Sequence, residues 1–166
     1  MKSRSLLVIT VVMVTLMLTL SAAAHEGPPK KAGGDFYYIA YPSGPPKVAG
    51  CNMFFPSYDE AIWEGTFEGT STEDGMVVLH CNGKVSFKGK LTFVGKVDGR
   101  SGTLEISQVG QCCDEQGHWK IQWVILSGTE GLATLRGQGT MFGPGAGGFG
   151  IWGYEEYDGN YHFEPD

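Results

Sequence analysis

The sequence predicts an all-β fold, a single closed antiparallel barrel of eight strands arranged mostly as a meander. Apolar and polar residues alternate with a period of two over long stretches, which is typical of strands with one buried face. Asp-Gly and Asn-Gly dipeptides separate these stretches and favour tight hairpins. Glycines recur on the predicted inner face, where they allow the sharp coiling that barrel closure requires. A two-sheet β-sandwich is the competing architecture.

The clearest alternation covers residues 84–97, with lysines on the outer face and the inner face formed by Val85, Phe87, Gly89, Leu91, Phe93, Gly95 and Val97. Similar patterns predict strands near residues 35–41, 63–69, 104–106, 119–125, 131–142, 149–156 and 160–164. The predicted turns are Asp74-Gly75, Asn82-Gly83, Asp98-Gly99 and Asp158-Gly159. No helix of consequence is expected after the N-terminal segment.

The N-terminal residues 1–24 have the layout of a secretory signal peptide. Lys2 and Arg4 precede an apolar run from Leu6 to Leu20, and small residues end the segment at Ala22-Ala23-Ala24. The apolar run is shorter than the roughly 20 residues of a membrane-spanning helix. We therefore expect cleavage after Ala24 and a secreted or periplasmic protein; an uncleaved N-terminal anchor is the alternative.

The remaining 142 residues are enough for one domain. Residues 25–34 are predicted to be a flexible leader, residues 35–58 an irregular segment rich in proline and aromatic residues, and residues 59–166 the barrel. Loss of Lys2 and Arg4 changes the net charge from −6 to −8. An acidic domain without a basic stripe is a poor partner for nucleic acid or for anionic membranes.

Four cysteines, Cys51, Cys81, Cys112 and Cys113, are expected to form two disulfides in an exported chain. A bond between Cys112 and Cys113 is the least expected of the three connectivities, because adjacent side chains of a strand point to opposite faces. Cys51 and Cys81 are therefore each expected to pair with one member of the doublet, in an order that the residues leave open.

Four glycine-centred motifs carry a family resemblance: GTFEGT at 65–70, FVGKVDGRSGTL at 93–104, WVILSGT at 123–129 and GLATLRGQGT at 131–140. This series resembles a bacterial family of unknown function that is grouped with the allene oxide cyclase-like barrels, which include the plant dirigent proteins. The resemblance implies an eight-stranded antiparallel barrel. Better-known relatives act on or orient apolar small molecules inside the barrel, but none of the matched motifs carries their catalytic residues.

The motifs associated with common chemistries are missing from this sequence. The cysteines lack the C-x-x-C spacing of zinc sites, so neither a metal nor another cofactor is expected. The glycine-rich run 143–150 precedes a predicted strand, whereas a phosphate loop precedes a helix. The acidic groups at Asp114-Glu115 and at Glu155, Glu156 and Asp158 fall at predicted turns, where solvated charges are expected.

Aromatic side chains with inward parity are the candidate ligand-binding residues: Trp63, Phe67, Phe87, Phe93, Trp119 and Trp123. They either fill the barrel or line a cavity for a small apolar or aromatic molecule. We expect a non-enzymatic, secreted binding protein. A cyclase or isomerase that uses the same cavity is one alternative, favoured if the cavity holds a buried carboxylate, histidine or tyrosine. A structural or interaction protein with a filled core is the other.

Overall fold

The computed structural model describes residues 28–114 and 116–165, and the predicted signal peptide lies outside them. In this part of the chain nine strands form one antiparallel sheet: β1 (Lys30–Pro42), β2 (Lys47–Ala49), β3 (Asn52–Gly65), β4 (Phe67–Leu79), β5 (Val85–Val97), β6 (Arg100–Cys112), β7 (Trp119–Gly128), β8 (Leu135–Gly145) and β9 (Trp152–Phe163). A short 3-10 helix, η1 (Glu130–Leu132), connects β7 to β8. Among the described residues no helix is long and apolar enough to cross a membrane.

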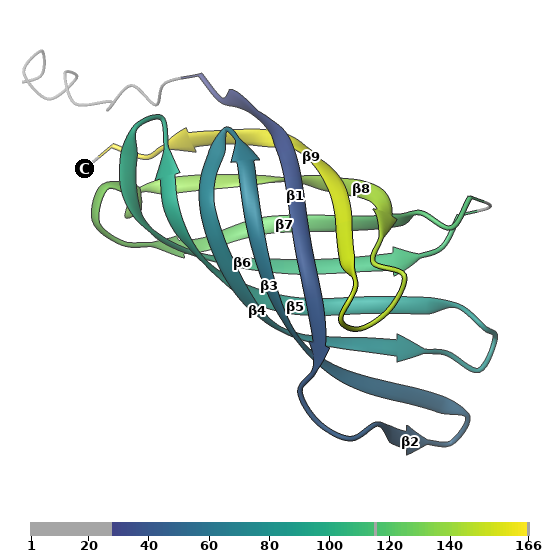
Figure 1. Ribbon diagram of the computed structural model, residues 1–166. Coiled ribbons are helices and arrows are strands. Elements are labelled where there is room, and N and C mark those ends of the chain that lie inside the picture. The colour runs from purple at the N-terminus through teal and green to yellow at the C-terminus, as the bar shows by residue number, and fades with distance from the viewer. Residues whose placement is uncertain (1–27, 115, 166) are drawn as a thin grey trace, which may run out of the picture.

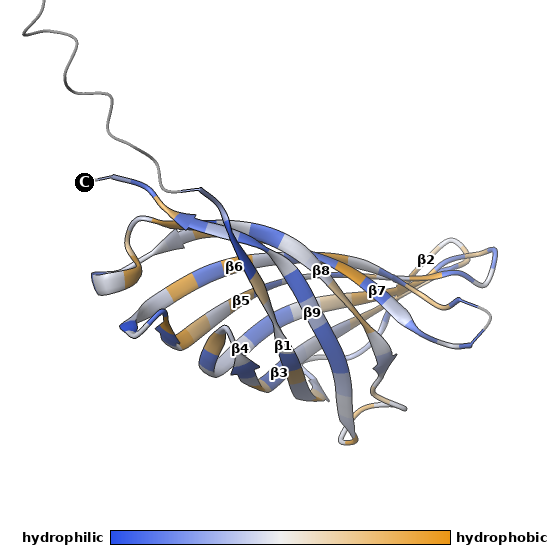
Figure 2. Ribbon diagram, turned by 90° about the horizontal axis from the view of Figure 1, so that it is seen from above, coloured by the Kyte–Doolittle hydropathy of each residue, from blue (hydrophilic) through white to orange (hydrophobic). Residues whose placement is uncertain are grey.

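The sheet closes into a barrel because β1 pairs with both β9 and β3 (Figure 1). The remaining barrel strands follow one another as a meander from β3 to β9, and β2 is an extra strand that pairs with the start of β3. The prediction of a closed, eight-stranded antiparallel barrel is therefore confirmed, with one added strand. Apolar and polar bands alternate along the strands (Figure 2), as a barrel with a buried inner face requires.

The barrel begins earlier in the chain than the sequence predicts, since β1 starts at Lys30 inside the expected leader. Gly33 and Gly34 give this part of β1 no apolar pattern, but both pair with β9, and Gly34 also pairs with Gly65 of β3. A Cβ atom on Gly34 would lie 1.9 Å from the Glu64 carbonyl oxygen, so close strand approach explains this glycine.

Residues 35–58 are strands β1, β2 and the start of β3, not the predicted irregular segment. Prolines suggested irregularity because they donate no ladder hydrogen bond. Pro56, however, lies where β3 changes its partner from β2 to β1, and its carbonyl accepts a hydrogen bond from Ser43 N at 3.0 Å. Pro42 ends β1, so neither proline interrupts the ladder.

Two of the predicted turns lie within strands. Gly75 is inside β4, where a Cβ would lie 2.6 Å from Phe87, and Gly159 is inside β9, where a Cβ would lie 2.5 Å from Trp123. These glycines make room for interior rings. The predicted strand 63–69 is instead divided by a turn at Gly65, whose φ of 109° suits glycine. The predicted turns at Asn82-Gly83 and Asp98-Gly99 are confirmed, each between two strands.

The disulfides join Cys51 to Cys81 and Cys112 to Cys113, so the expected pairing is wrong. Met53 pairs with Leu79 in the β3–β4 ladder, and two residues further out the same register places Cys51 opposite Cys81. Cys112 is the last residue of β6, and Cys113 lies beyond the strand, where side chains no longer need to alternate.

Candidate functional site

One half of the barrel interior is filled. Trp63, Phe67, Phe93 and Trp123 are buried there, with edge-to-face contacts between Trp63 and Phe67 at 5.7 Å and between Phe67 and Trp123 at 5.8 Å. Leu132 of η1 is fully buried beside Gly102 and Gly128 in the same half. Four of the six candidate aromatic residues therefore belong to the packed core and not to a cavity wall.

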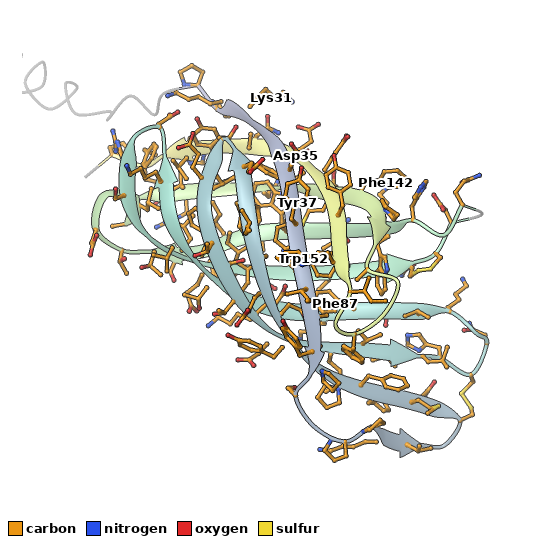
Figure 3. All side chains as sticks on the ribbon, in the orientation of Figure 1. Lys31, Asp35, Tyr37, Phe87, Phe142 and Trp152 are labelled. Atoms are coloured by element: carbon orange, nitrogen blue, oxygen red, sulfur yellow. A yellow bond between two sulfur atoms is a disulfide. The ribbon has the colours of Figure 1, made fainter. Side chains whose placement is uncertain are left out.

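The other half of the barrel contains a cavity of about 310 Å³, at the end where the β4–β5 and β8–β9 loops lie (Figure 1). Of the six candidate aromatic residues, Phe87 and Trp119 line this cavity. Phe87 lies far from Lys31, which marks the opposite end of the barrel (Figure 3). Further apolar walls come from Phe36, Tyr38, Ala40, Phe55, Val77, Ile121 and Phe149.

The glycine-rich run between β8 and β9 forms part of the cavity wall. Ala146, Gly148 and Phe149 line the cavity, and two backbone amides of the run donate hydrogen bonds to β1. Ala146 N donates to the Tyr38 hydroxyl at 3.0 Å, and Gly150 N donates to the Ala40 carbonyl at 2.7 Å. This run therefore covers the cavity rather than cradling a phosphate at a helix N-terminus.

Three buried carboxyl groups also line the cavity, and the sequence pattern did not predict them as a site. Asp59 on β3 is 7% exposed, Glu73 on β4 is 4% exposed and Glu155 on β9 is fully buried. Asp59 and Glu73 are direct partners across the β3–β4 ladder. Glu155 was expected at a solvated turn, but it lies within β9, where strand alternation turns it inward.

The inward parity of these acids was visible in the sequence. Glu73 shares its parity with Phe67, and Asp59 shares its parity with Trp63. Each acid is followed by an exposed acidic residue, in the pairs Asp59-Glu60, Glu73-Asp74 and Glu155-Glu156. An acidic residue on the apolar face of a predicted strand is the signal that could have found this site, because unpaired charges are rarely buried.

The cavity leaves several polar atoms without partners within the described part of the chain. Among them are Ser57 Oγ, Asp59 Oδ1, Glu73 Oε1 and both carboxyl oxygens of Glu155. Buried polar groups in native proteins are nearly always hydrogen-bonded. Gln108, also in the cavity wall, has only a weak contact from Nε2 to Met141 Sδ at 3.5 Å. These atoms are free to bind a ligand.

Burial and mutual repulsion shift the titration of the cavity acids. Burial raises the pKa of Asp59 to about 7. Burial and, secondarily, the Asp59 charge raise the pKa of Glu155 to about 8. The pKa of Glu73 is raised well above its ordinary value by burial and then by Asp59 and Glu155. Loss of hydration favours the neutral acid in each case, so the site changes its charge near neutral pH.

No metal-binding group of three or more His, Cys, Asp or Glu side chains occurs within residues 28–114 and 116–165. The three carboxyl groups therefore do not converge as ligands of one ion. Their surroundings are aromatic rings and aliphatic side chains, which suit an organic molecule.

The fold and the cavity together define a small closed barrel that is packed at one end and hollow at the other. Residues 57–147 match the model of a family described as "Protein of unknown function (DUF3224)", and the chain belongs to that family. The predicted resemblance to a bacterial family of unknown function is thereby confirmed.

A solved structure of a DUF3224 protein of unknown function from Shewanella oneidensis MR-1 has a similar fold. Its TM-score is 0.67 at 19% sequence identity, and the match covers 83% of this chain and 99% of the other. The pterocarpan synthase dirigent protein GePTS1 matches with a TM-score of 0.49 and 13% identity, over 87% of this chain and 99% of that one. No curated protein matches the chain significantly.

Proposed function

We propose that this protein binds a small molecule with an aromatic or apolar body in the cavity of its barrel. The observation that carries the proposal is the cavity of about 310 Å³, walled by aromatic rings, in a barrel whose other half is packed. Its volume falls at the lower end of the range of about 300–1,000 Å³ for ligand pockets. The filled-core alternative predicts no such space.

The residues around the cavity support a space that is kept open. Gly75 and Gly89 pair with each other across β4 and β5, on the inward face next to Glu73. A Cβ atom on Gly89 would lie 2.0 Å from Glu73 Oε1 and 2.7 Å from Phe87. Ala40 also contributes only a methyl group to the wall. A side chain at Gly75 or Gly89 would displace cavity-lining residues such as Phe87, and a larger side chain at position 40 would enter the cavity itself.

We further propose that the protein acts outside the cytoplasm, as its N-terminal segment predicts. The two disulfides are compatible with an oxidising compartment. The binding site then samples small molecules of the periplasm or the surroundings of the cell.

Binding of the neutral fluorescent probe N-phenyl-1-naphthylamine tests the cavity. We expect saturable fluorescence enhancement with the wild-type protein and its loss in Val77→Trp, which fills the cavity. Val94→Trp is the matched control, because Val94 is exposed on the outer face of β5. Ala40→Phe is a second cavity-filling variant if Val77→Trp does not fold. Equal binding by both cavity-filling variants and the control would contradict the proposal.

A cyclase or isomerase is the second candidate function, and the buried carboxyl groups favour it. A neutral carboxylic acid with a pKa near 7 can donate a proton to a substrate, and a neighbouring carboxylate can accept one. Small molecules eluted from natively purified protein provide the test. Incubation with the wild-type protein should convert them to an isomer separable by chromatography, and Glu155→Gln should not. An unchanged molecule supports binding alone.

A further inference from the structure

We infer that the ligand of the barrel cavity is an organic cation, in which an aromatic or aliphatic body carries a protonated amine. This inference rests on the proposed binding function and specifies the chemistry of its ligand. Asp59, Glu73 and Glu155 supply the negative charge, and the aromatic wall receives the body of the ligand.

Within residues 28–114 and 116–165, the cavity acids form no ion pair with a cationic side chain. Among the residues that line the cavity there are three carboxyl groups and no lysine, arginine or histidine. Lys88 and Lys90 are on β5, the strand that pairs with the strand of Glu73, but both are exposed on the outer face. A buried carboxylate without a paired cation is costly. A cation brought by the ligand would remove this cost.

The hydrogen-bonding capacity of the cavity also matches an ammonium group. An alkylammonium offers three donors and no acceptor. The unpartnered cavity atoms include a hydroxyl oxygen, Ser57 Oγ, in addition to oxygens of the three acids. Ser57 is on β3 two residues before Asp59, with the same inward parity, so both face one region of the cavity. The Ser57 hydroxyl also acts on Asp59, whose pKa it lowers, so the two side chains form one polar region whose oxygens can accept hydrogen bonds from a ligand.

The aromatic wall provides a second attraction for a cation. The rings of Phe36, Tyr38, Phe87 and Trp119 surround the same space as the carboxyl groups. The face of an aromatic ring attracts an ammonium ion, and the attraction grows when the site is shielded from water. A bare metal ion gains little from such a wall, because Ca²⁺ needs six to eight oxygen ligands at about 2.3–2.6 Å.

Three probes with a common phenyl body test the charge preference: 2-phenylethylamine, 2-phenylethanol and 3-phenylpropionate. We would measure their affinities by isothermal titration calorimetry at about pH 8.5, where Asp59 and Glu155 are mostly ionised. We expect the amine to bind about tenfold or more tightly than the alcohol, and the carboxylate not to bind. Alcohol binding equal to or tighter than amine binding would overturn the inference.

Matched variants test whether the cavity carboxyl groups cause the preference for the amine. Glu155→Gln should weaken amine binding about tenfold and leave alcohol binding within about threefold. The adjacent exposed residue provides the control Glu156→Gln, which should change neither affinity. Asp59→Asn with its exposed control Glu60→Gln is a second pair, and circular dichroism verifies folding. Equal losses in Glu155→Gln and Glu156→Gln would assign the preference to surface charge and overturn the inference.

The naphthylamine probe separates failure of this inference from failure of the proposed function. If that probe binds in the cavity and the amine neither binds nor displaces it, the cation assignment is wrong and the cavity remains a binding site. If neither binds, both proposals fall. Tight binding of Ca²⁺ alone, lost in Glu155→Gln, would also overturn the assignment to an organic cation.

Discussion

Asp59 on β3 and Glu73 on β4 lie directly opposite each other, and both side chains face the interior of the barrel. Like charges in directly opposed positions of an antiparallel pair destabilise a sheet. Each of these carboxyl groups also has an oxygen without a partner among the described residues. Burial raises the pKa of Asp59 to about 7, and burial followed by the charges of Asp59 and Glu155 raises the pKa of Glu73, so the pair avoids the repulsion by holding protons. The acids of the cavity therefore hold protons that a positively charged ligand can release.

The first prediction concerns the pH dependence of stability. A carboxyl group whose pKa is raised in the folded state binds more protons than it does in the unfolded chain, so the free energy of unfolding falls as pH rises between the two pKa values. For Asp59 this window runs from about 4 to about 7, and for Glu155 from about 4.5 to about 8. The expected slope is on the order of 1 kcal/mol per pH unit for each group.

Urea unfolding between about pH 5 and pH 8.5 measures this slope. Asp98 and Asp114 have lowered pKa values, so they change the free energy of unfolding only below about pH 4 and not between about pH 5 and pH 8.5. The double variant Asp59→Asn with Glu155→Gln should flatten the dependence. A free energy of unfolding that rises from pH 5 to pH 8.5 would show that the cavity acids are not buried as described.

A single substitution should stabilise the protein at high pH. In Glu155→Gln, an amide replaces a buried carboxylate that must otherwise be held unpaired above its pKa of about 8. We expect a gain on the order of 2 kcal/mol at about pH 8.5 and a clearly smaller gain at about pH 5.5, where Glu155 is ionised only in the unfolded chain. Glu156→Gln should have a small effect at both values, because Glu156 is exposed. Thermal or urea unfolding distinguishes the two variants.

Binding of an amine should release protons. An alkylammonium stays charged to about pH 10, whereas the free cavity holds protons on Asp59, Glu73 and Glu155, which face one another from β3, β4 and β9. Tyr38 faces them from β1 and stays neutral, because burial raises its pKa above the ordinary value. Amine affinity should therefore rise between about pH 6 and pH 8.5, as those acids ionise.

Calorimetry in buffers of different ionisation enthalpy measures the number of protons released. The affinity of 2-phenylethanol should not rise over the same range, because it brings no charge. Amine affinity that is independent of pH, with no proton release, would place the amine away from the carboxyl groups.

The architecture could be predicted because strand parity distinguishes inside from outside. All six candidate aromatic residues point inward as their parity predicted. Parity does not give the height of a residue along the barrel axis, which depends on how far each strand is shifted against its neighbours. Trp63 and Trp123 lie in the packed half for this reason, whereas Phe87 and Trp119 line the cavity.

Two of the turns predicted from Asp-Gly dipeptides are wrong, because packing rather than turn geometry requires the glycine there. Asp74-Gly75 and Asp158-Gly159 have the composition of hairpin turns, but their glycines make room for the rings of Phe87 and Trp123 on nearby strands. At Asp98-Gly99 both residues have positive φ values, 52° and 75°, and the turn is real. Local sequence does not separate these cases, because the ring that excludes a Cβ comes from another strand.

The two disulfides should differ in their effect on stability. The bond between Cys51 and Cys81 closes a segment with a sequence separation of 30, which corresponds to about 3–4 kcal/mol if the stabilisation is attributed to chain entropy. The bond between Cys112 and Cys113 joins adjacent residues and restricts the unfolded chain very little. The double variant Cys51→Ser with Cys81→Ser should lower the urea midpoint much more than Cys112→Ser with Cys113→Ser. Similar losses would contradict this difference.

A single hydroxyl group in the packed half should also contribute measurably to stability. Tyr157 is 2% exposed, and its hydroxyl oxygen accepts a hydrogen bond from Phe67 N at 2.9 Å and donates one to the Glu64 carbonyl at 3.2 Å. Both partners flank the β3–β4 turn, so the hydroxyl links β9 to that turn. Tyr157→Phe leaves a buried N–H and a carbonyl unpaired, at a cost of about 1–3 kcal/mol.

The control for this variant is on the same strand. The Tyr154 hydroxyl donates to Asp35 Oδ1 at 2.9 Å on the outer side of the barrel, where water can replace it. Tyr154→Phe should therefore change the free energy of unfolding by about 0.5 kcal/mol or less. Equal effects of the two substitutions in urea unfolding would mean that water reaches the β3–β4 turn, and that this half of the barrel is less tightly packed than its buried rings indicate.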